Sequence, residues 1–422
     1  MHHVTLSSVI RPMGFMPREI TSLVNCEVVD AHVGEAAFLW VRRQAAAEAA
    51  HYKLHHLAKV DARVSAHLAG LRVAGVAGCA AARAALGEGS AGALFVVTWL
   101  GAVHGDTKAL RNALQLGLSS PTFGNEVAAG VGWLDASYAL PLLRRFADSS
   151  EPGLRYLGLD GEVVHEIVDA THLRLATQDD SPAVRARAIC GIGESGRREL
   201  APVARSALGD ADAACRFWAA WTCALLGDAS AAPAALDIAL DFPAYLEPGL
   251  QVAMRCGEIQ WARDAVRSLA AQPATRRTAI RAAGALGDPA TLPWLLAFLD
   301  EPLHARVAGE AIASITGADL AYLDLDRDSP DDDEPLDADA DLPYPDASAL
   351  NDWWRDVKPR YVSGHRYLGG GPAALTTALT VLRSGYQRQR AGAAIEFAAQ
   401  SPGTWLFPVR ARVDRQNRRL AA

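Results

Sequence analysis

The stretch RRTAIRAAGALGDP, residues 276–289, contains the pattern that decides the fold. From Ala279 to Leu286 its apolar residues recur at the spacing of a helix, and Gly287 follows them directly. A glycine just past a helix end adopts the left-handed backbone conformation without a Cβ clash, and Asp288 suits the start of the next helix. A second helical run extends from Leu292 to Leu299. The unit therefore predicts a helix, a glycine turn and another helix.

The same unit recurs along residues 181–317. Its glycines are separated by 31, 30, 30 and 30 residues: Gly196, Gly227, Gly257, Gly287 and Gly317. An arginine stands eleven residues before four of them, namely Arg185, Arg216, Arg276 and Arg306, and Leu246 occupies the fifth equivalent position. A guanidinium donates several hydrogen bonds at once, so we expect these arginines to hold adjacent repeats together. The alternative is a row of anion-binding side chains.

A pair of helices of about 12 residues each cannot bury its own apolar face, so such pairs stack with a continuous core. The sequence therefore predicts an all-α protein, an α-solenoid of short repeats with a small helical C-terminal cap. Period and pattern resemble HEAT repeats in a compact form, since the usual HEAT period is nearer ~40 residues.

Composition narrows the class of protein. The chain has 422 residues, of which 50% are hydrophobic and 21% charged, enough apolar residues for a sizeable folded core. A net charge of −7 gives no overall reason to bind nucleic acid. The six cysteines are scattered without a Cys-x-x-Cys pair, as in a reducing compartment. With no apolar run of a signal peptide or a membrane span, we expect a cytoplasmic protein that does not bind membranes.

Charge and pattern divide the chain into five segments. Residues 1–20 are expected to form a flexible extension, residues 21–90 two or three helices, and residues 91–323 the repeats. Residues 324–350 hold 11 acidic residues against Arg327 and are expected to form a mobile linker, because they repel one another and include four prolines. Residues 351–422 have a charge of +8 and are expected to form a basic cap with helices at 373–384 and 387–399. As an alternative to a mobile linker, the acidic segment folds back onto this cap.

The loop from Arg360 to Pro372 is the most informative part outside the repeats. It combines glycines that expose backbone N–H groups with cations and tyrosines. Of two alternatives we favour an ordered loop that fastens the cap onto the last repeat, since glycine and tyrosine are what a tightly packed loop needs. The other alternative is partner binding by residues in and before the loop: Trp353, Trp354, Lys358, Arg360, Tyr361, His365, Arg366 and Tyr367. The loop lacks the Lys-Ser or Lys-Thr ending of a nucleotide-binding loop, so ATP is not indicated.

Several polar patterns resemble metal or catalytic sites without completing one. A single His165-Glu166 pair is too few for a diiron centre, and His51 and His55 lack a third ligand. The aspartates from Asp324 to Asp328 begin like a calcium loop, but the glycine and glutamate that should follow are absent. Gly193-Glu-Ser-Gly196 is not a nucleophile elbow. We therefore predict no catalytic residue, no metal site and no cofactor.

Four segments together resemble a proteobacterial HEAT-repeat family of unknown function: Glu35 to Trp40, Leu57 to Leu71, Ala282 to Pro289, and Gly364-His-Arg-Tyr367. The resemblance extends from about residue 29 to residue 399. Members of that family often occur near genes for type VI secretion and its effector-loading adaptors. The resemblance therefore implies an accessory role in that system, and it transfers no catalytic residue.

These observations predict a non-enzymatic scaffold or adaptor whose partner is a protein or a peptide. One alternative is an enzyme that resembles lyases with HEAT-like repeats, which would need a polar pocket with a paired nucleophile or base. The other is nucleic-acid binding by the basic C-terminal region, which the overall charge does not favour. The sequence makes no prediction about the oligomeric state.

Overall fold

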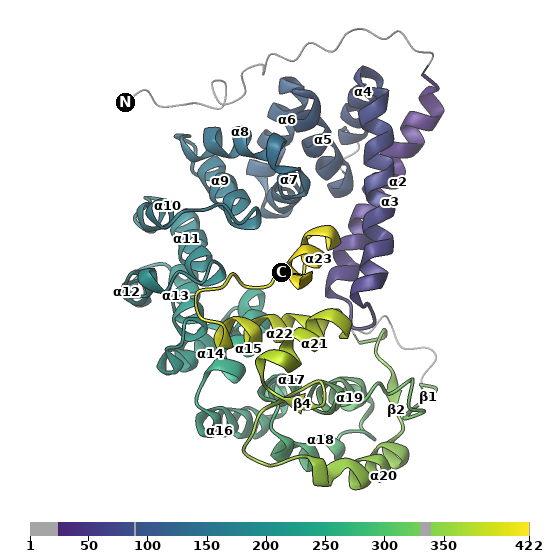
Figure 1. Ribbon diagram of the computed structural model, residues 1–422, viewed down its shortest axis with the longest axis vertical. Helices are drawn as coiled ribbons and strands as arrows, with labels where there is room; N and C mark the ends of the chain where they lie inside the picture. The colour runs from purple at the N-terminus through teal and green to yellow at the C-terminus, as the bar shows by residue number, and fades with distance from the viewer. Residues whose placement is uncertain (1–23, 88–89, 330–338, 422) are drawn as a thin grey trace. The chain divides into compact units, whose positions relative to one another are not determined.

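The computed structural model describes residues 24–87, 90–329 and 339–421 (Figure 1). The predicted extension at residues 1–20 lies outside this part of the chain. The described residues form helices and two short antiparallel strand pairs. They divide into two compact units: residues up to 47, 55–191 and 410–418 form the first, and residues 48–54, 192–409 and 419 onward form the second. The C-terminal segment thus contributes to both units, a division different from the predicted boundaries.

The first unit contains ten helices and most of the final one. Their bounds are α2 (Cys26–Glu48), α3 (Leu54–Ala74), α4 (Val76–Leu86), α5 (Ala91–His104), α6 (Thr107–Ser119), α7 (Pro121–Trp133), α8 (Ala136–Ala147), α9 (Pro152–Val164), α10 (Ala170–Ala176), α11 (Pro182–Glu194), which continues into the second unit, and α23 (Val413–Ala421). No single helix in the described ranges is long and apolar enough to cross a membrane. Helices α3 and α4 taken together have the length and composition of a membrane span, but the chain bends by 119° between them.

The core of the first unit is centred on α2 and α5. The Trp40 indole stacks on Phe95 at a centroid distance of 3.8 Å, and Trp133 meets both rings edge-on. The α2 backbone passes so close to Gly92 that a Cβ there would overlap the Ala37 carbonyl. Small residues therefore let these helices approach closely.

A buried arginine joins the C-terminal segment to this core. The Arg43 guanidinium donates to Asp61 at 3.0 Å and to the carbonyl oxygens of Arg410 and Ala411 at 2.6 and 2.8 Å. The other Asp61 oxygen accepts from the Val413 backbone N–H at 2.8 Å. Because a buried charge needs a full set of partners, the first unit is complete only when residues 410–413 are in place.

The second unit contains the later repeats and the rest of the C-terminal region. Its helices and strands are α12 (Ala201–Ser206), α13 (Ala213–Leu225), α14 (Ala232–Asp241), α15 (Leu246–Cys256), α16 (Ile259–Ala270), α17 (Arg276–Leu286), α18 (Leu292–Leu296), α19 (Pro302–Thr316), β1 (Asp326–Arg327), β2 (Tyr344–Pro345), α20 (Ala347–Val357), β3 (Tyr367–Leu368), β4 (Gly371–Pro372), α21 (Leu375–Ser384) and α22 (Gln387–Gln400). Short 3₁₀ turns connect them: η1 (Arg198–Leu200), η2 (Ala207–Gly209), η3 (Ala229–Ala231), η4 (Pro243–Tyr245), η5 (Pro273–Thr275), η6 (Pro289–Thr291) and η7 (Lys358–Arg360).

The repeat glycines lie at the turns between paired helices. Gly196, Gly227, Gly287 and Gly317 have φ values of 65°, 105°, 74° and 71°. Gly257 differs from the expectation, because it ends α15 in an extended conformation with φ −72° and ψ 164°. Glu166 lies thirty residues before Gly196, at the equivalent position of the preceding repeat, and has φ 57°. The repeat thus extends one unit further toward the N terminus, with glutamate in the place of glycine.

The repeat arginines contact the loop that precedes their own helix. Arg185 donates to the Asp179 carbonyl at 3.0 Å, and Arg216 donates to the Asp210 carbonyl at 2.8 Å. Arg155, which stands eleven residues before Glu166, binds its own loop and also donates to both Asp179 carboxylate oxygens at 2.7 and 2.8 Å. These contacts favour the structural interpretation of the arginine ladder over an anion-binding row.

The later repeat arginines use other partners. Arg306 donates to the carbonyl oxygens of Ala340 and Leu342, in the acidic segment. Arg276 lies 5.8 Å from the centre of the Phe298 ring and 4.0 Å from the Glu301 carboxylate. They too are engaged within the fold.

The described ends of the acidic segment are folded, unlike the mobile linker expected at residues 324–350. Strands β1 and β2 pair Asp326 with Pro345. Asp339 is buried and lies 2.5 Å from an Arg277 nitrogen and 4.0 Å from an Arg388 nitrogen. These arginines offset the charge of Asp339, and the contact with Arg388 is the one expected if the acidic segment folds back on the basic region.

The predicted C-terminal helices form, and Arg388 of α22 contacts Glu310 in the last repeat helix. Most of α22, however, packs against α15 and α13, in the middle of the repeat array (Figure 1). Its Gly392 makes this possible, since a Cβ there would lie 2.5 Å from the Arg255 guanidinium. The apolar face of the last repeat is covered by residues of the acidic segment and by α20, including Leu325, Leu350 and Trp354.

Candidate partner-binding surface

Helix α20 places both tryptophans of the predicted surface. The Asp346 carboxylate accepts from the Ala349 N–H at 2.8 Å and starts the helix. Trp354 is buried in the core with Leu350, and Trp353 is partly buried against the same core. The tryptophans therefore anchor α20 to the repeats.

The two tyrosines of the loop are also engaged in packing. The Tyr361 hydroxyl donates to the Thr316 carbonyl at 3.0 Å, and the Tyr367 hydroxyl accepts from the Val362 N–H at 3.0 Å. The Tyr367 N–H donates to the Gly287 carbonyl at 2.8 Å. Each tyrosine thus fixes the loop to the end of a repeat helix.

Arg366 fastens the loop to a third repeat. Its guanidinium donates to the carbonyl oxygens of Met254 and Gly257 at 3.1 and 2.5 Å. A helix leaves its last carbonyls without partners, so an arginine there satisfies groups that would otherwise face water or remain unpaired. The role of Arg366 within the chain is to cap α15.

The loop glycines complete this attachment. Gly364 N–H donates to the Asp288 carboxylate at 3.1 Å, and the N–H groups of Gly369 and Gly370 donate to Ser314 and Ile315 at 2.8 and 3.1 Å. A Cβ at Gly317 would lie 2.6 Å from the Gly369 carbonyl carbon. The structure therefore matches the fastening alternative, with the loop fixed to three successive repeat turns.

Several side chains of the same loop region remain exposed. Besides Pro359 and Ser363, they include Lys358, Arg360 and His365, and Val362 with 55% of its surface accessible. The side chains of Lys358 and Arg360 make no hydrogen bond or ion pair with the described residues. We call Lys358, Arg360, Val362 and His365 the basic loop surface.

Other C-terminal cations are engaged within the fold. Arg388 donates to both Glu310 oxygens at 3.2 and 3.1 Å, Arg412 donates to the Trp133 carbonyl at 2.9 Å, and Arg415 donates to the Leu134 carbonyl at 2.7 Å. Buried Arg390 donates to the Leu382 carbonyl at 2.7 Å, and burial lowers its pKa to about 10. The charge of +8 thus serves mainly to attach the C-terminal region to the rest of the protein.

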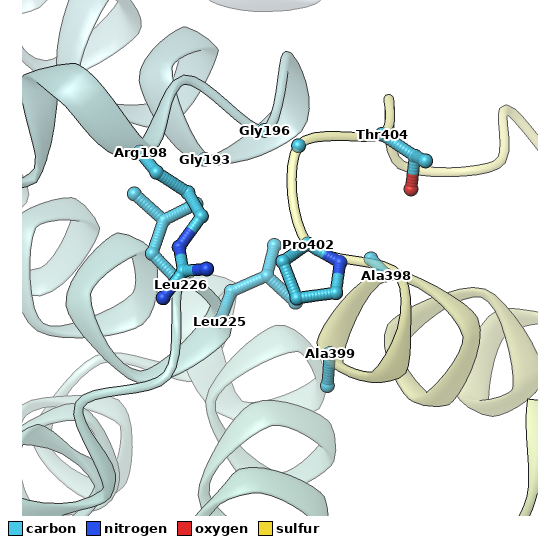
Figure 2. A pocket seen from close by; sticks show the side chains of 10 residues that line it. Gly193, Gly196, Arg198, Leu225, Leu226, Ala398, Ala399, Pro402 and Thr404 are labelled. Carbon is cyan, nitrogen blue, oxygen red and sulfur yellow. The ribbon is translucent and has the colours of Figure 1, made fainter.

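A small pocket lies where the C-terminal segment crosses the turn at Gly196. Figure 2 shows Arg198 and Leu225 on the repeat side and Pro402 on the other. Its volume of about 10 Å³ suits a single water, whereas ligand sites typically occupy roughly 300 Å³ or more. The Leu406 N–H donates to the Glu194 carbonyl at 2.7 Å beside it. The pocket is a packing junction.

The described residues that resembled parts of a metal or catalytic site in the sequence do not form a cluster in the structure. The described residues contain no group of three or more histidine, cysteine, aspartate or glutamate side chains placed to hold a metal. His165 contacts the Val131 carbonyl at 3.2 Å, and burial together with nearby Arg415 lowers its pKa to about 4. Burial also raises the pKa of the Cys79 and Cys256 thiols, to about 11 and about 12, opposite to what a nucleophile needs.

The stacked helix pairs, left-handed turns and arginine contacts define an α-solenoid of repeats. Comparison with known families supports the same class at a finer level: a model of HEAT repeats matches residues 170–246, from α10 to the start of α15. Residues 170–246 thus match the HEAT-repeat pattern, within an all-α array of helix pairs. No curated protein matches the chain. HEAT repeats commonly serve as protein-interaction scaffolds and are typically non-catalytic.

Sequence reasoning missed some of the residues that organise this region. Glu166 and Arg155 were overlooked because the glycine marker is replaced there, although counting thirty residues back from Gly196 reaches Glu166. Pro402 and Thr404, which cross the Gly196 turn, have no local signal. Their role depends on a contact between segments about two hundred residues apart in the chain.

Proposed function

We propose that the protein is a non-enzymatic scaffold that binds a protein or peptide partner at the basic loop surface. The proposal rests on one observation, the contrast between the fixed backbone of this loop and its exposed side chains. Its backbone is fixed to the turns at Gly257, Gly287 and Gly317, while Lys358, Arg360, Val362 and His365 remain exposed. Side chains held on a rigid backbone lose less entropy on binding, which suits them to recognition.

The chemistry of the surface defines the partner. Two cations and a histidine stand within four residues of the exposed, apolar Val362 in the sequence, so we expect an acidic segment that also carries an apolar side chain. Nucleic acid is not favoured, because a strand needs an extended track of free cations, and most C-terminal arginines are engaged internally. A lyase would need a pocket with a nucleophile, which the junction at Pro402 does not provide.

The resemblance described above suggests where this partner belongs. We propose that it is a component of type VI secretion, such as an effector or its loading adaptor. The support for this finer proposal is the resemblance alone, and the same experiment tests it.

Site-specific photocrosslinking in the native cell tests the proposal. A benzophenone amino acid replaces Val362 in one variant and Val73, an exposed residue on α3, in the control. We expect one partner to crosslink at position 362 and not at position 73. The double change Lys358→Glu with Arg360→Glu should abolish that crosslink, whereas Arg267→Glu, which removes an exposed cation on α16, should retain it. Equal crosslinking in both charge variants would refute the basic loop surface as the binding site.

A further inference from the structure

Helix α2 carries an exposed apolar stripe that packing within the chain does not explain. The stripe consists of Ala31, Gly34, Phe38, Val41 and Ala45, spaced 3, 4, 3 and 4 residues apart. All five are exposed, and Phe38 and Val41 have 60% and 49% of their surfaces accessible. This spacing is that of the contact positions in a two-helix coiled coil.

The other faces of α2 are already occupied. Trp40 and Arg43 are buried on the core side, and His32 contacts His67 of α3 with the ring nitrogens 3.0 Å apart. At Gly34, by contrast, a Cβ would meet nothing within 4 Å. None of the described residues therefore covers the stripe, whose two large side chains lie between small ones.

A pair of opposite charges on one flank of the stripe indicates what kind of molecule binds to it. Glu35 and Arg42 are both exposed and stand seven residues apart, so they lie on the same side of the helix. Arg63 of α3 reaches within 3.9 Å of the Glu35 carboxylate, and both side chains are more than half exposed. Glu35 thus remains accessible to a second cation.

We propose that the stripe is a two-fold interface between two copies of this chain, with the α2 helices antiparallel. In this register Phe38 of each copy packs on Val41 of the other, and Gly34 faces Ala45. Glu35 of each copy then lies about 3 Å along the axis from Arg42 of the other, given the rise of an α-helix. A parallel pair would instead place Glu35 opposite Asp30 of the other copy, which is repulsive, and Arg42 opposite Ala37.

The size of the interface sets its strength. One helix per subunit is at the small end of specific interfaces, so we expect a Kd of about 10 µM. The small residues at 31, 34 and 45 let the backbones approach and keep the two large side chains in contact. Measurements therefore need protein concentrations from about 1 to 200 µM to span the transition.

Sedimentation equilibrium of the full-length chain tests the proposal. The wild type should dimerise over that range, and Phe38→Glu should be monomeric with an unchanged circular-dichroism spectrum and thermal unfolding. Leu175→Glu is the matched control, since it adds the same charge at an exposed leucine on α10, and it should dimerise like the wild type. Arg42→Glu should weaken dimerisation about tenfold, because two symmetric pairs are lost, and Glu35→Arg combined with Arg42→Glu should restore it.

Disulfide trapping tests the register. In a Cys26→Ser background, which removes the exposed native cysteine of α2, the double variant Glu35→Cys with Arg42→Cys should form a covalent dimer under mild oxidation. Glu35→Cys alone should not, because two copies of residue 35 would be about 13 Å apart along the axis.

A monomeric wild type at 200 µM would overturn the proposal, as would dimers that survive Phe38→Glu. Efficient crosslinking by Glu35→Cys alone would show a register in which the two copies of residue 35 face each other, and so refute the proposed one. Dimers that form only after removal of residues 1–23 would assign the stripe to that segment instead. Binding of a different protein to the stripe, with the chain itself monomeric, would equally refute a second copy as occupant.

Discussion

The turns at Gly287 and at Glu166 occupy equivalent positions in the repeat, but they contact the C-terminal segment in different ways. Gly287 has φ 74°, and a Cβ there would overlap the Tyr367 carbonyl oxygen. Glu166 has φ 57° with a side chain, and the adjacent His165 ring lies 3.4 Å from an Arg415 nitrogen. One turn accepts the C-terminal segment through backbone contact, the other through side chains. The comparison shows that glycine is required by the crossing chain as much as by the turn.

The largest effect should come from Gly287→Ala. The new methyl group meets Tyr367 and also strains the left-handed backbone, so we expect a loss of about 3 kcal/mol in the free energy of unfolding. Gly227→Ala is the control: φ is again positive, but nothing lies within 4 Å of the Cβ position, so the loss should be about 1 to 2 kcal/mol. Urea denaturation measures both, and equal losses would contradict the role assigned to the crossing chain.

A somewhat smaller effect should follow Arg366→Ala. The change leaves the Met254 and Gly257 carbonyls without their donor, which should cost about 2 kcal/mol. Hydrogen exchange of the amides at residues 367–370 should accelerate. Arg360→Ala, an exposed neighbour, should change stability by less than about 0.5 kcal/mol. If both variants behave alike, Arg366 does not fasten the loop.

The Glu166 turn should make stability depend on pH. Burial and Arg415 lower the pKa of His165 from 6.5 to about 4, so the unfolded chain binds a proton that the folded protein excludes. Stability should therefore be complete above pH 6.5 and fall as the pH drops toward 4, by about 1 to 2 kcal/mol at pH 5. His165→Gln should remove this component from unfolding curves measured between pH 7 and pH 5. An identical slope in the variant would exclude His165 as its source.

The smallest effect should come from Glu166→Gly. Glycine relieves the left-handed strain, which should stabilise the protein by about 0.5 to 1 kcal/mol. The gain should appear as a higher thermal midpoint. Glu162→Gly, in the last turn of α9, is a destabilising control, because it places glycine in a helix and removes the contact with His172. A loss of stability in Glu166→Gly would show that the glutamate side chain matters more than the strain.

The repeat fold was predictable because its signals are local. The thirty-residue period, the apolar spacing before Gly287 and the positive φ at most repeat glycines depend on neighbouring residues only. Gly257 departs from the pattern, and Leu246 eleven residues before it already marks that repeat as irregular. The absence of the usual arginine at position 246 therefore indicated in the sequence that this turn differs from the others.

The role of the loop residues could not be predicted from the sequence. The sequence indicated the loop after α20, but Tyr361, Arg366 and Tyr367 suit partner binding and packing equally by residue type. Only the distances to Thr316 and Gly257 distinguish the two roles. Contacts between segments a hundred or more residues apart leave no periodic signal, which is also why the folded ends of the acidic segment were missed.

The contact of Arg43 with the carbonyls of Arg410 and Ala411 has a consequence for biosynthesis. These partners are separated by 367 and 368 residues, among the longest separations that a chain of 422 residues allows. During translation Arg43 leaves the ribosome long before its partners exist, so the first unit remains incomplete until residues 410–413 have been made. Contacts of such high order slow folding. A nascent chain that ends before residue 410 would therefore hold a buried arginine whose carbonyl partners have not yet been synthesised.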